Sequence, residues 1–425
     1  MTALLFISFF IMILIGVPIA VALGIAALLV IVHGIGIPLI VSSQTIFNGI
    51  NSFPLMAVPF FILAGNLMGE GGISSKLIQF VNLFFARLKG GLAIVAIGAS
   101  MIFAAISGSC PATTAAIGGI MVPEMKKAGY DARFSAATVA AAGTVGQVIP
   151  PSIPMVTYCV LANTSVGTLF LAGVGPGILM GAIMMIIAYI YAVKHGVPRI
   201  KTKISGSEFL HTLLDSIPAL LMPVIILGGI YSGIFTPTES GAIACVYSII
   251  AGMFIYKELK VKDLKKVFAK SAVSAAVIMM IMGTVSLFSF ILTRQRIPQA
   301  IAETLLGITS NKYILLFLFN IILLIAGCFL NSSAAIALLT PILLPVLTGV
   351  GIDPYHIGII FIVNMGIGMI TPPVGTCLYV ATNISKLKFE EIVQGVLPYL
   401  AGLLIAMLAV TYIEPISLGL VHLLG

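Results

Sequence analysis

Two clusters of small polar residues interrupt an otherwise apolar chain. The first is "AISGSCPATTAA" at 105–116, and the second is "AGCFLNSSAAIA" at 326–337. Their hydroxyls, an amide and a closely approachable backbone can bind small polar ligands without placing a full charge in apolar surroundings. Small residues also let membrane helices pack closely, which is the alternative interpretation of either cluster taken alone. A second motif beside both clusters favours the binding interpretation.

The second motif is a double proline inside an apolar stretch. "GQVIPPSIP" occupies 146–154, and "GMITPPVGT" occupies 368–376. Proline removes a backbone donor and clashes with the preceding turn, so each motif should break a helix and free carbonyl oxygens. Freed carbonyls at the C-terminal end of a half-helix are ligands for Na⁺ in secondary transporters. We therefore expect one cation between the first cluster and 146–152, and another between the second cluster and 368–374.

The elements that position these motifs are predicted to be membrane helices. Of the 425 residues, 60% are hydrophobic and only 8% are charged, whereas soluble domains carry roughly a quarter charged residues. The composition predicts an all-α polytopic membrane protein in contact with lipid. Basic cytoplasmic loops explain the net charge of +8 better than nucleic-acid binding does.

The two halves of the chain repeat one another. Pro150 and Pro151 recur 222 positions later as Pro372 and Pro373, and the same offset relates Asp131 to Asp353. The stretch "EMKKAGYDAR" is basic, whereas its counterpart "VLTGVGIDPYH" contains no Lys or Arg. By the positive-inside rule the two lie on opposite sides of the membrane. The sequence therefore predicts two inverted-topology repeats, which are typical of secondary transporters.

These constraints predict about ten transmembrane helices plus two re-entrant hairpins, whose arms of about fifteen residues are too short to cross. The first repeat covers 1–203, with a hairpin at about 90–125 and a broken helix at about 131–163. The second covers 204–425, with a hairpin at about 312–347 and a broken helix at about 353–386.

The basic residues also predict which segments face the cytoplasm. Both termini are expected on the external, periplasmic side, and residues 205–214 are expected to form an interfacial helix leading into the second half. The basic segments expected in the cytoplasm are 126–133, 194–203 and 257–270.

Several motifs together resemble those of one transporter family. They are "SGSCPATTAAIG", "VIPPSIPM", "IFTPTESGA", "LTRQRIP", "FLNSSAA" and "ITPPVGT". As a set, and over essentially the whole chain, they resemble the large membrane subunit of a tripartite ATP-independent periplasmic (TRAP) transporter. The resemblance implies an elevator-type, Na⁺-driven importer of an organic acid, such as sialic acid or a C4-dicarboxylate, in the bacterial inner membrane. It also implies two partners, a small four-helix membrane subunit and a periplasmic substrate-binding protein. Two or more Na⁺ ions are expected, with no other metal and no organic cofactor.

The resemblance and the repeat offset imply a set of binding residues. The expected ligands of the first Na⁺ are Ala105, Ser107, Gly146, Ile149 and Ser152. The expected ligands of the second are Gly327, Gly368, Thr371 and Val374. Substrate is expected at Ser109, Asn331, Ser332 and Ser333, and at Arg294, whose guanidinium can hold a carboxylate through two hydrogen bonds. Alternatively, Arg294 and Arg296 form a pair in an external loop. Glu239 is expected to cap a helix start with Thr236 or Thr238.

Two other functions are alternatives to organic-acid import by a TRAP subunit. An intramembrane hydrolase would pair Ser107 or Ser109 with a histidine, but all five histidines fall at expected span ends or in loops, so we do not expect an enzyme. A standalone divalent-anion/Na⁺ symporter of similar hairpin architecture is the stronger alternative.

Overall fold

The computed structural model describes residues 1–197, 205–309 and 311–424, and all regular elements in them are helices. The basic residues expected at 198–203 lie outside the described residues. The helices of the first half are α1 (Thr2–Leu14), α2 (Ile19–Val30), η1 (Ile31–Ile35), α3 (Ile40–Ile50), η2 (Pro54–Met56), α4 (Ala57–Glu70), α5 (Ile73–Phe85), α6 (Gly91–Ser107), α7 (Cys110–Lys127), α8 (Ala132–Gly143), η3 (Thr144–Gln147), α9 (Ile153–Ala162) and α10 (Val166–Lys194).

The second half of the chain is also helical. They are α11 (Gly206–Tyr231), α12 (Pro237–Ile250), η4 (Ala251–Ile255), α13 (Val261–Arg294), α14 (Ile297–Ile308), α15 (Lys312–Phe329), α16 (Ser332–Gly349), α17 (Pro354–Gly368), α18 (Thr376–Ser385), α19 (Phe389–Tyr412) and α20 (Pro415–Leu424).

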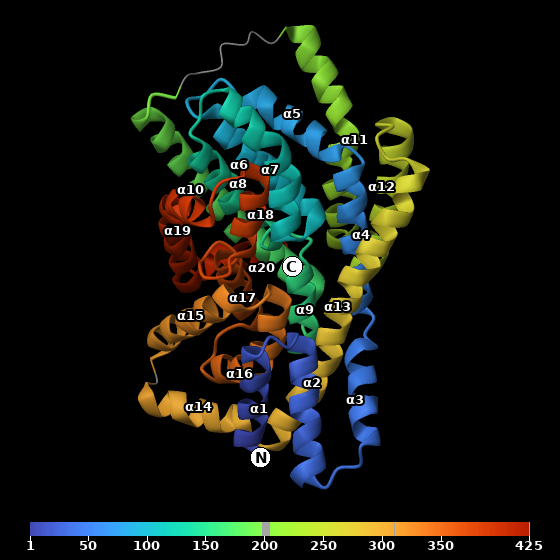
Figure 1. Ribbon diagram of the computed structural model, residues 1–425, viewed down its shortest axis with the longest axis vertical. Helices are drawn as coiled ribbons and strands as arrows, with labels where there is room; N and C mark the ends of the chain where they lie inside the picture. The colour runs from blue at the N-terminus through green and yellow to red at the C-terminus, as the bar shows by residue number, and fades with distance from the viewer. Residues whose placement is uncertain (198–204, 310, 425) are drawn as a thin grey trace.

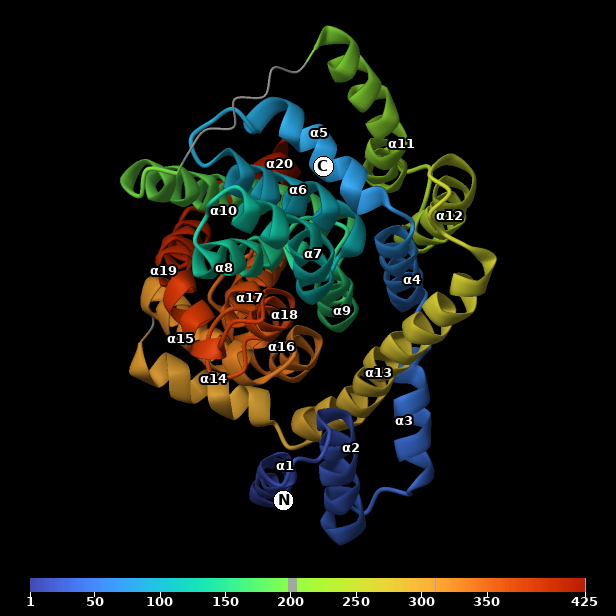
Figure 2. The same ribbon diagram turned by 45° about the horizontal axis from the view of Figure 1, so that its top comes forward.

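The helices form two groups that meet along α13 and α4 (Figure 1). An inner group contains the two helix–tip–helix units α6–α7 and α15–α16, the broken helices α8–α9 and α17–α18, and the helices α10 and α19 packed on them. An outer group contains α2, α3 and α4, which pack against α13. Figure 2 shows α13 running obliquely between these groups, with α16 on one side and α3 on the other.

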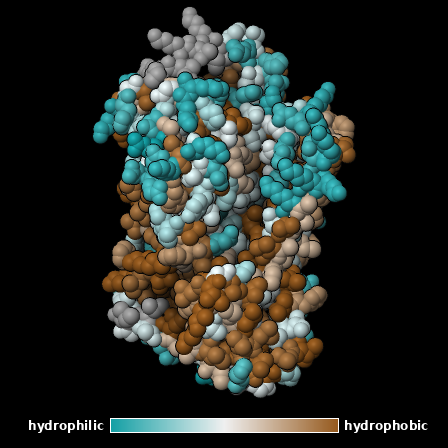
Figure 3. All heavy atoms as spheres, in the orientation of Figure 1, coloured by the Kyte–Doolittle hydropathy of each residue, from teal (hydrophilic) through white to brown (hydrophobic). Residues whose placement is uncertain are grey.

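The chain is a multi-pass membrane protein. Seven helices in the described ranges are long and apolar enough to cross a membrane, or eight if α3 and the continuation to Glu70, bent by 63°, form one span. Two of the seven, α15 and α16, are the arms of the second hairpin, so the other spans of the expected ten would have to come from shorter helices such as α1, which has 13 residues. Figure 3 shows hydrophobic side chains over the half of this face that carries α1, α2 and α14, and hydrophilic ones gathering over the opposite half.

The expected arm length of the hairpins was wrong, and the division of these helices into re-entrant hairpins and broken helices stays a prediction. The four arms contain 17 or 18 residues instead of about fifteen, because all four helices extend into the polar clusters at 105–116 and 326–337. The arms α15 and α16 are each long enough to cross a membrane, so arm length does not by itself make the second hairpin re-entrant.

Local capping explains where several of these helices begin. Asp131 caps α8 by accepting from the amides of Arg133 and Phe134, and Asp353 caps α17 in the same way from Tyr355 and His356. A side-chain oxygen at this position satisfies amides that have no partner inside the helix. The two caps are 222 positions apart, as the repeat requires.

The expected cap by Glu239 is also confirmed. Thr236 Oγ1 accepts from the Glu239 amide at 3.2 Å, and Glu239 Oε2 accepts from the Thr236 amide at 2.8 Å. This reciprocal pair is a capping box, which fixes the start of α12.

The residues expected to form an interfacial helix at 205–214 belong to a longer helix. These residues form the first turns of the continuous helix α11, which runs to Tyr231 through Pro218 and Pro223. The Pro218 carbonyl accepts from Tyr247 Oη of α12 at 2.8 Å, so α12 contacts α11 beside its first proline.

The broken helices α8–α9 and α17–α18 begin at opposite ends of the inner group. The start of α8 lies beside the end of α10, where the rings of Phe134 and Tyr191 stack with centroids 3.6 Å apart. The start of α17 lies instead at the end of α9, where Tyr158 Oη donates to the Pro354 carbonyl at 2.6 Å. At the α8 end, Lys126 Nζ reaches the Ser385 carbonyl at 3.5 Å, which brings the basic ends of α7 and α18 together.

Candidate functional site

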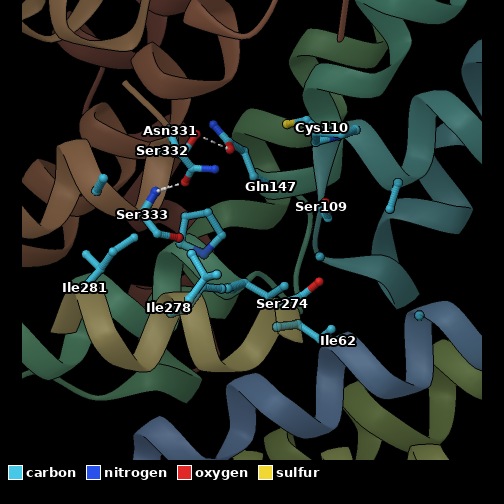
Figure 4. Close-up of a pocket in the computed structure, with 18 of the residues that line it drawn as sticks. Ile62, Ser109, Cys110, Gln147, Ser274, Ile278, Ile281, Asn331, Ser332 and Ser333 are labelled. Carbon is cyan, nitrogen blue, oxygen red and sulfur yellow. Dashed lines mark hydrogen bonds between the residues drawn. The ribbon is translucent and has the colours of Figure 1, made fainter. Parts of the chain in front are cut away.

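The two hairpin tips face one cavity of about 720 Å³. Figure 4 shows Ser109 and Cys110 on one side of it, Asn331, Ser332 and Ser333 on the other, and Ser274, Ile278 and Ile281 of α13 along a third wall. Four of the five residues expected to bind substrate, Ser109 and the three at 331–333, are therefore brought together from two helix ends. The volume lies within the range of small-molecule sites.

The first tip is tied directly to the first break. The Ile153 amide at the start of α9 donates to the Gly108 carbonyl at 3.4 Å, and Ser107 Oγ lies 2.8 Å from Thr113 Oγ1. Gly108 has φ +60°, a conformation that favours glycine, and a Cβ there would lie 2.9 Å from the Pro151 carbonyl oxygen. The side chain of Ser152 accepts from the Met155 amide and caps α9.

Gly146 brings the break against the same tip. A Cβ at Gly146 would lie 2.7 Å from the carbonyl oxygen of Ser109 and 2.8 Å from Thr113 Oγ1. Gly146, Ser107 and Ser152 therefore lie close to the same tip, and their role as cation ligands stays a prediction. Ala105 is buried two residues before Ser107 in α6, whereas the side chain of Ile149 lies against the position of Gly177 in α10.

The second tip meets the second break through two glycines. A Cβ at Gly368 would lie 2.6 Å from the carbonyl oxygen of Gly327, so the two backbones are in direct contact. Thr371 Oγ1 donates to the Ile367 carbonyl at 2.8 Å. Val374 is 37% exposed, whereas the first break is almost entirely buried.

Both breaks leave backbone carbonyls without donors. Among the described residues, no hydrogen bond ends on the carbonyls of 148–151 or of 370–374. A buried polar group without a partner costs about 1–3 kcal/mol, so four such groups in the buried first break are expensive unless a ligand compensates. Carbonyl oxygens suit hard cations such as Na⁺. Within the described residues no cluster of three or more His, Cys, Asp or Glu could hold another metal.

The tips also point helix N-termini at the cavity. Helix α7 begins after Ser109, which makes no side-chain cap, and α16 begins after Asn331, whose Oδ1 accepts only from the Ser333 amide at 3.0 Å. The amides of Cys110, Ala112, Ser332 and Ala334 therefore have no partner among the described residues. Free amides at helix N-termini form anion-binding sites.

The structure does not bring Arg294 to these tips. Arg294 is exposed at the last residue of α13, and Ile281 is the last α13 residue that lines the cavity. Thirteen residues of helix separate the two, or about 20 Å at the usual rise per residue. Arg296 is likewise exposed beyond the helix end. The external-pair interpretation fits these positions better than direct contact with substrate at the tips.

Two residues of the site were missed in the sequence. Gln147, 2% exposed, lines the cavity and accepts a hydrogen bond from Ser332 at 2.8 Å. Lys270 on α13 is the one charged residue among the described cavity-lining residues. The sequence assigned Lys270 to a basic cytoplasmic segment at 257–270, but α13 begins at Val261 and carries Lys270 more than two turns into the helix.

The hydrolase alternative gains no support from the histidines. His356 is the one buried histidine among the described residues, and its ring nitrogens contact Ser417 Oγ at 2.6 Å and the Thr411 carbonyl at 3.2 Å. Neither partner belongs to the tips. Among the described residues, no hydrogen bond joins a histidine to Ser107 or Ser109.

The chain is similar to known transporter proteins in sequence and in fold. Residues 6–416 match the family model described as the DctM component of the tripartite ATP-independent periplasmic transporter. The chain is 44% identical to the C4-dicarboxylate TRAP transporter large permease protein DctM of Pseudomonas aeruginosa, covering 89% of both chains. It is 37% identical to the sialic acid TRAP transporter large permease protein SiaM of Vibrio cholerae, covering 96% of this chain and 95% of that one.

Two further comparisons extend this picture. The chain is 44% identical over 96% of its length to the isethionate TRAP transporter permease protein DctMQ of Oleidesulfovibrio alaskensis, and spans 65% of that protein. A crystal structure of the YdaH transporter of Alcanivorax borkumensis shares the fold, with a TM-score of 0.63 at 16% identity over 88% of both chains.

Proposed function

The chain belongs to the DctM family, the large permease component of tripartite ATP-independent periplasmic transporters, and on this premise we propose that it imports an organic acid coupled to Na⁺. The observation that carries the proposal is the polarity of the helix ends around the cavity. At each tip a C-terminal helix end, which carries partial negative charge, is followed within three residues by an N-terminal end, which carries partial positive charge. A cation and an anion can therefore bind next to each other without any buried acidic side chain.

The organic acid binds between the tips in this proposal. The free amides at the starts of α7 and α16 take the carboxylate or sulfonate, and the hydroxyls of Ser109 and Ser333 take its remaining polar groups. Named relatives carry C4-dicarboxylate, sialic acid and isethionate. All three are organic anions, and a cavity of about 720 Å³ does not select among them by size.

Two Na⁺ ions bind at the two breaks. The first is held by carbonyls near Gly146 with Ser107 and Ser152 at hand, and the second by carbonyls near Gly327, Gly368 and Thr371. The donor-free carbonyls of 148–151 and 370–374 support this assignment, because neutral oxygens are the ligands available there.

An elevator movement of the inner group along α13 moves the cavity from one side of the membrane to the other. The opposite entry of α8 and α17 supports the inverted repeats on which such a movement depends. The chain acts in the bacterial inner membrane with a small four-helix subunit and a periplasmic binding protein that delivers the acid.

Uptake by the reconstituted protein tests this proposal against a standalone divalent-anion/Na⁺ symporter. Labelled succinate, N-acetylneuraminate and isethionate are supplied with or without a Na⁺ gradient, small subunit and binding protein. We expect uptake of at least one of these acids, and this uptake should require the Na⁺ gradient, the small subunit and the binding protein. Na⁺-driven uptake of a dicarboxylate without the partners would favour the standalone symporter, and no uptake of any anion would overturn organic-acid transport.

The inverted topology gives a prediction at equivalent positions of the repeat. Lys127 and Gly349 are 222 positions apart and lie at the ends of α7 and α16, both exposed. A membrane-impermeant maleimide should label Lys127→Cys only from the cytoplasm and Gly349→Cys only from outside. Labelling of both from the same side would contradict the inverted repeat.

Lys270 should contribute to the affinity for the acid. Replacing Lys270 by Gln should raise the KM for uptake by about threefold to tenfold, a modest effect because the side chain is exposed to solvent. Lys270→Arg should stay close to wild type. Lys266→Gln is the matched control, because Lys266 is exposed on the same helix but does not line the cavity. Equal KM values in the two Gln variants would remove Lys270 from the site.

A further inference from the structure

The side chain of Gln147 joins the first break to the second hairpin. Gln147 ends the short helix η3 directly after Gly146. Its Nε2 donates to the Ile362 carbonyl of α17 at 3.0 Å, and its Oε1 accepts from Ser332 Oγ at 2.8 Å. Figure 4 shows this second bond crossing from Gln147 to the tip that carries Asn331 and Ser332. One buried side chain thus connects three elements that belong to different halves of the chain.

The close approach of α17 to η3 depends on a glycine. A Cβ at Gly366 would lie 3.2 Å from the Thr144 carbonyl oxygen and 3.3 Å from Gln147 Nε2. Because Gly366 has no side chain, the amide of Gln147 reaches the helix backbone beyond it. A shift of η3 by a fraction of an ångström therefore changes the position of the Gln147 amide.

The two hydrogen bonds fix the orientation of the amide and of the hydroxyl that faces it. A carbonyl can only accept, so Nε2 must point at Ile362 and Oε1 must point at Ser332. Ser332 therefore uses its only proton on Gln147 and presents its lone pairs to other partners. Ser332 lines the cavity, so at the tip it acts as an acceptor for a ligand hydroxyl or cation.

We propose that Gln147 couples occupancy of the first cation site to binding of the organic acid, by holding Ser332 in this orientation. The proposal rests on the function proposed above. A cation bound to the carbonyls of the first break fixes η3, η3 fixes the Gln147 amide, and the amide fixes the Ser332 hydroxyl at the opposite tip. Linkage requires the reverse as well, so the acid should raise the affinity for the cation. Gln147 is in this sense a positioning residue.

The test is a double-mutant cycle read as a function of Na⁺, in the complex with its small subunit and binding protein. The probe is whichever of succinate, N-acetylneuraminate or isethionate the wild type takes up. In the wild type, the KM for the acid should fall by about tenfold between limiting and saturating Na⁺, a typical coupling between two sites. In Gln147→Met and in Ser332→Ala, the KM should become nearly independent of Na⁺. The double variant should behave like either single variant, since each removes the same hydrogen bond.

Ser333→Ala is the matched control. Ser333 is buried beside Ser332 and lines the same cavity, but no described hydrogen bond joins its side chain to Gln147. Its replacement should raise the KM equally at all Na⁺ concentrations, and the effect should add to that of Gln147→Met. Because Ser332→Ala breaks the bond from the far side, a folding defect of Gln147→Met does not remove the test.

The outcomes separate the coupling from the function on which it rests. Wild-type uptake that ignores Na⁺ would overturn Na⁺ coupling and this proposal together. Wild-type uptake that depends on Na⁺, with an unchanged Na⁺ dependence in Gln147→Met and Ser332→Ala or with additive effects of the two, would overturn the role of Gln147 alone.

Discussion

Replacement of Gly368 by Ala is expected to abolish transport while the protein still reaches the membrane. The new Cβ would lie 2.5–2.7 Å from three backbone atoms of Gly327, and backbone cannot rotate away as a side chain can. The second tip and the second break must therefore separate by roughly 1 Å, a misplacement that can reduce activity a hundredfold. Alanine is a better helix former than glycine by about 1 kcal/mol, so an unstable helix is not the expected cause.

Gly146→Ala should act in the same way at the first site. Its Cβ would lie 2.7 Å from the Ser109 carbonyl oxygen. The controls are Gly349→Ala and Gly119→Ala, two helical glycines whose added Cβ would meet nothing within 4 Å. In uptake measured against Na⁺ concentration, only Gly146→Ala and Gly368→Ala should lose transport or need far more Na⁺. Wild-type Na⁺ curves for Gly146→Ala and Gly368→Ala would contradict the assignment of cations to these contacts.

The parts of the fold that sequence predicted well are those that local chemistry determines. Proline breaks, caps and small-residue tips act over a few residues, and the repeat offset allowed each to be checked against its counterpart. The helix α8 begins beside Asp131 and α17 beside Asp353, so the expected starts of the broken helices were accurate. The expected Na⁺ ligands and the elevator movement stay predictions.

The expectations that failed depend on contacts between distant parts of the chain. The polar start of α11 suggested an interfacial helix, but these residues continue into one helix through Pro218, whose carbonyl contacts Tyr247 of α12. Arg294 was linked to substrate by resemblance, whereas its distance from the tips depends on the length and path of α13. The spacing of residues in the sequence does not predict the path of α13.

Two residues of the site were missed for the same reason, because their roles depend on contacts with distant parts of the chain. Gln147 lies inside the double-proline motif at 146–154, but its partners Ile362 and Ser332 lie 215 and 185 residues away. Lys270 was counted among the positive charges of a loop, and only the early start of α13 turns it toward the cavity. A buried Gln next to a double proline is a signal that could have been followed, because a buried amide requires partners.

Replacing both prolines of a break by Ala is expected to separate a binding role from a packing role. Each proline costs about 3 kcal/mol in a helix interior, so Pro372→Ala with Pro373→Ala should let α17 continue toward α18. The carbonyls of 370–374, which now have no donor among the described residues, would then pair within the helix. If the break served packing alone, this variant should express at least as well as wild type and transport normally.

If the carbonyls bind Na⁺, expression should stay normal and uptake should be lost, with a strongly raised Na⁺ requirement in any residual activity. The first break offers an internal comparison, because Pro154 stays in place when Pro150 and Pro151 are replaced. Pro154 has no amide N–H to donate to the carbonyl four residues earlier, so a continuous helix should form less completely across the first break than across the second. We therefore expect the larger loss from the pair at Pro372 and Pro373, measured as uptake against Na⁺ concentration for both double variants. A wild-type Na⁺ response in both would mean that the breaks serve the packing of the inner group and that Na⁺ binds elsewhere.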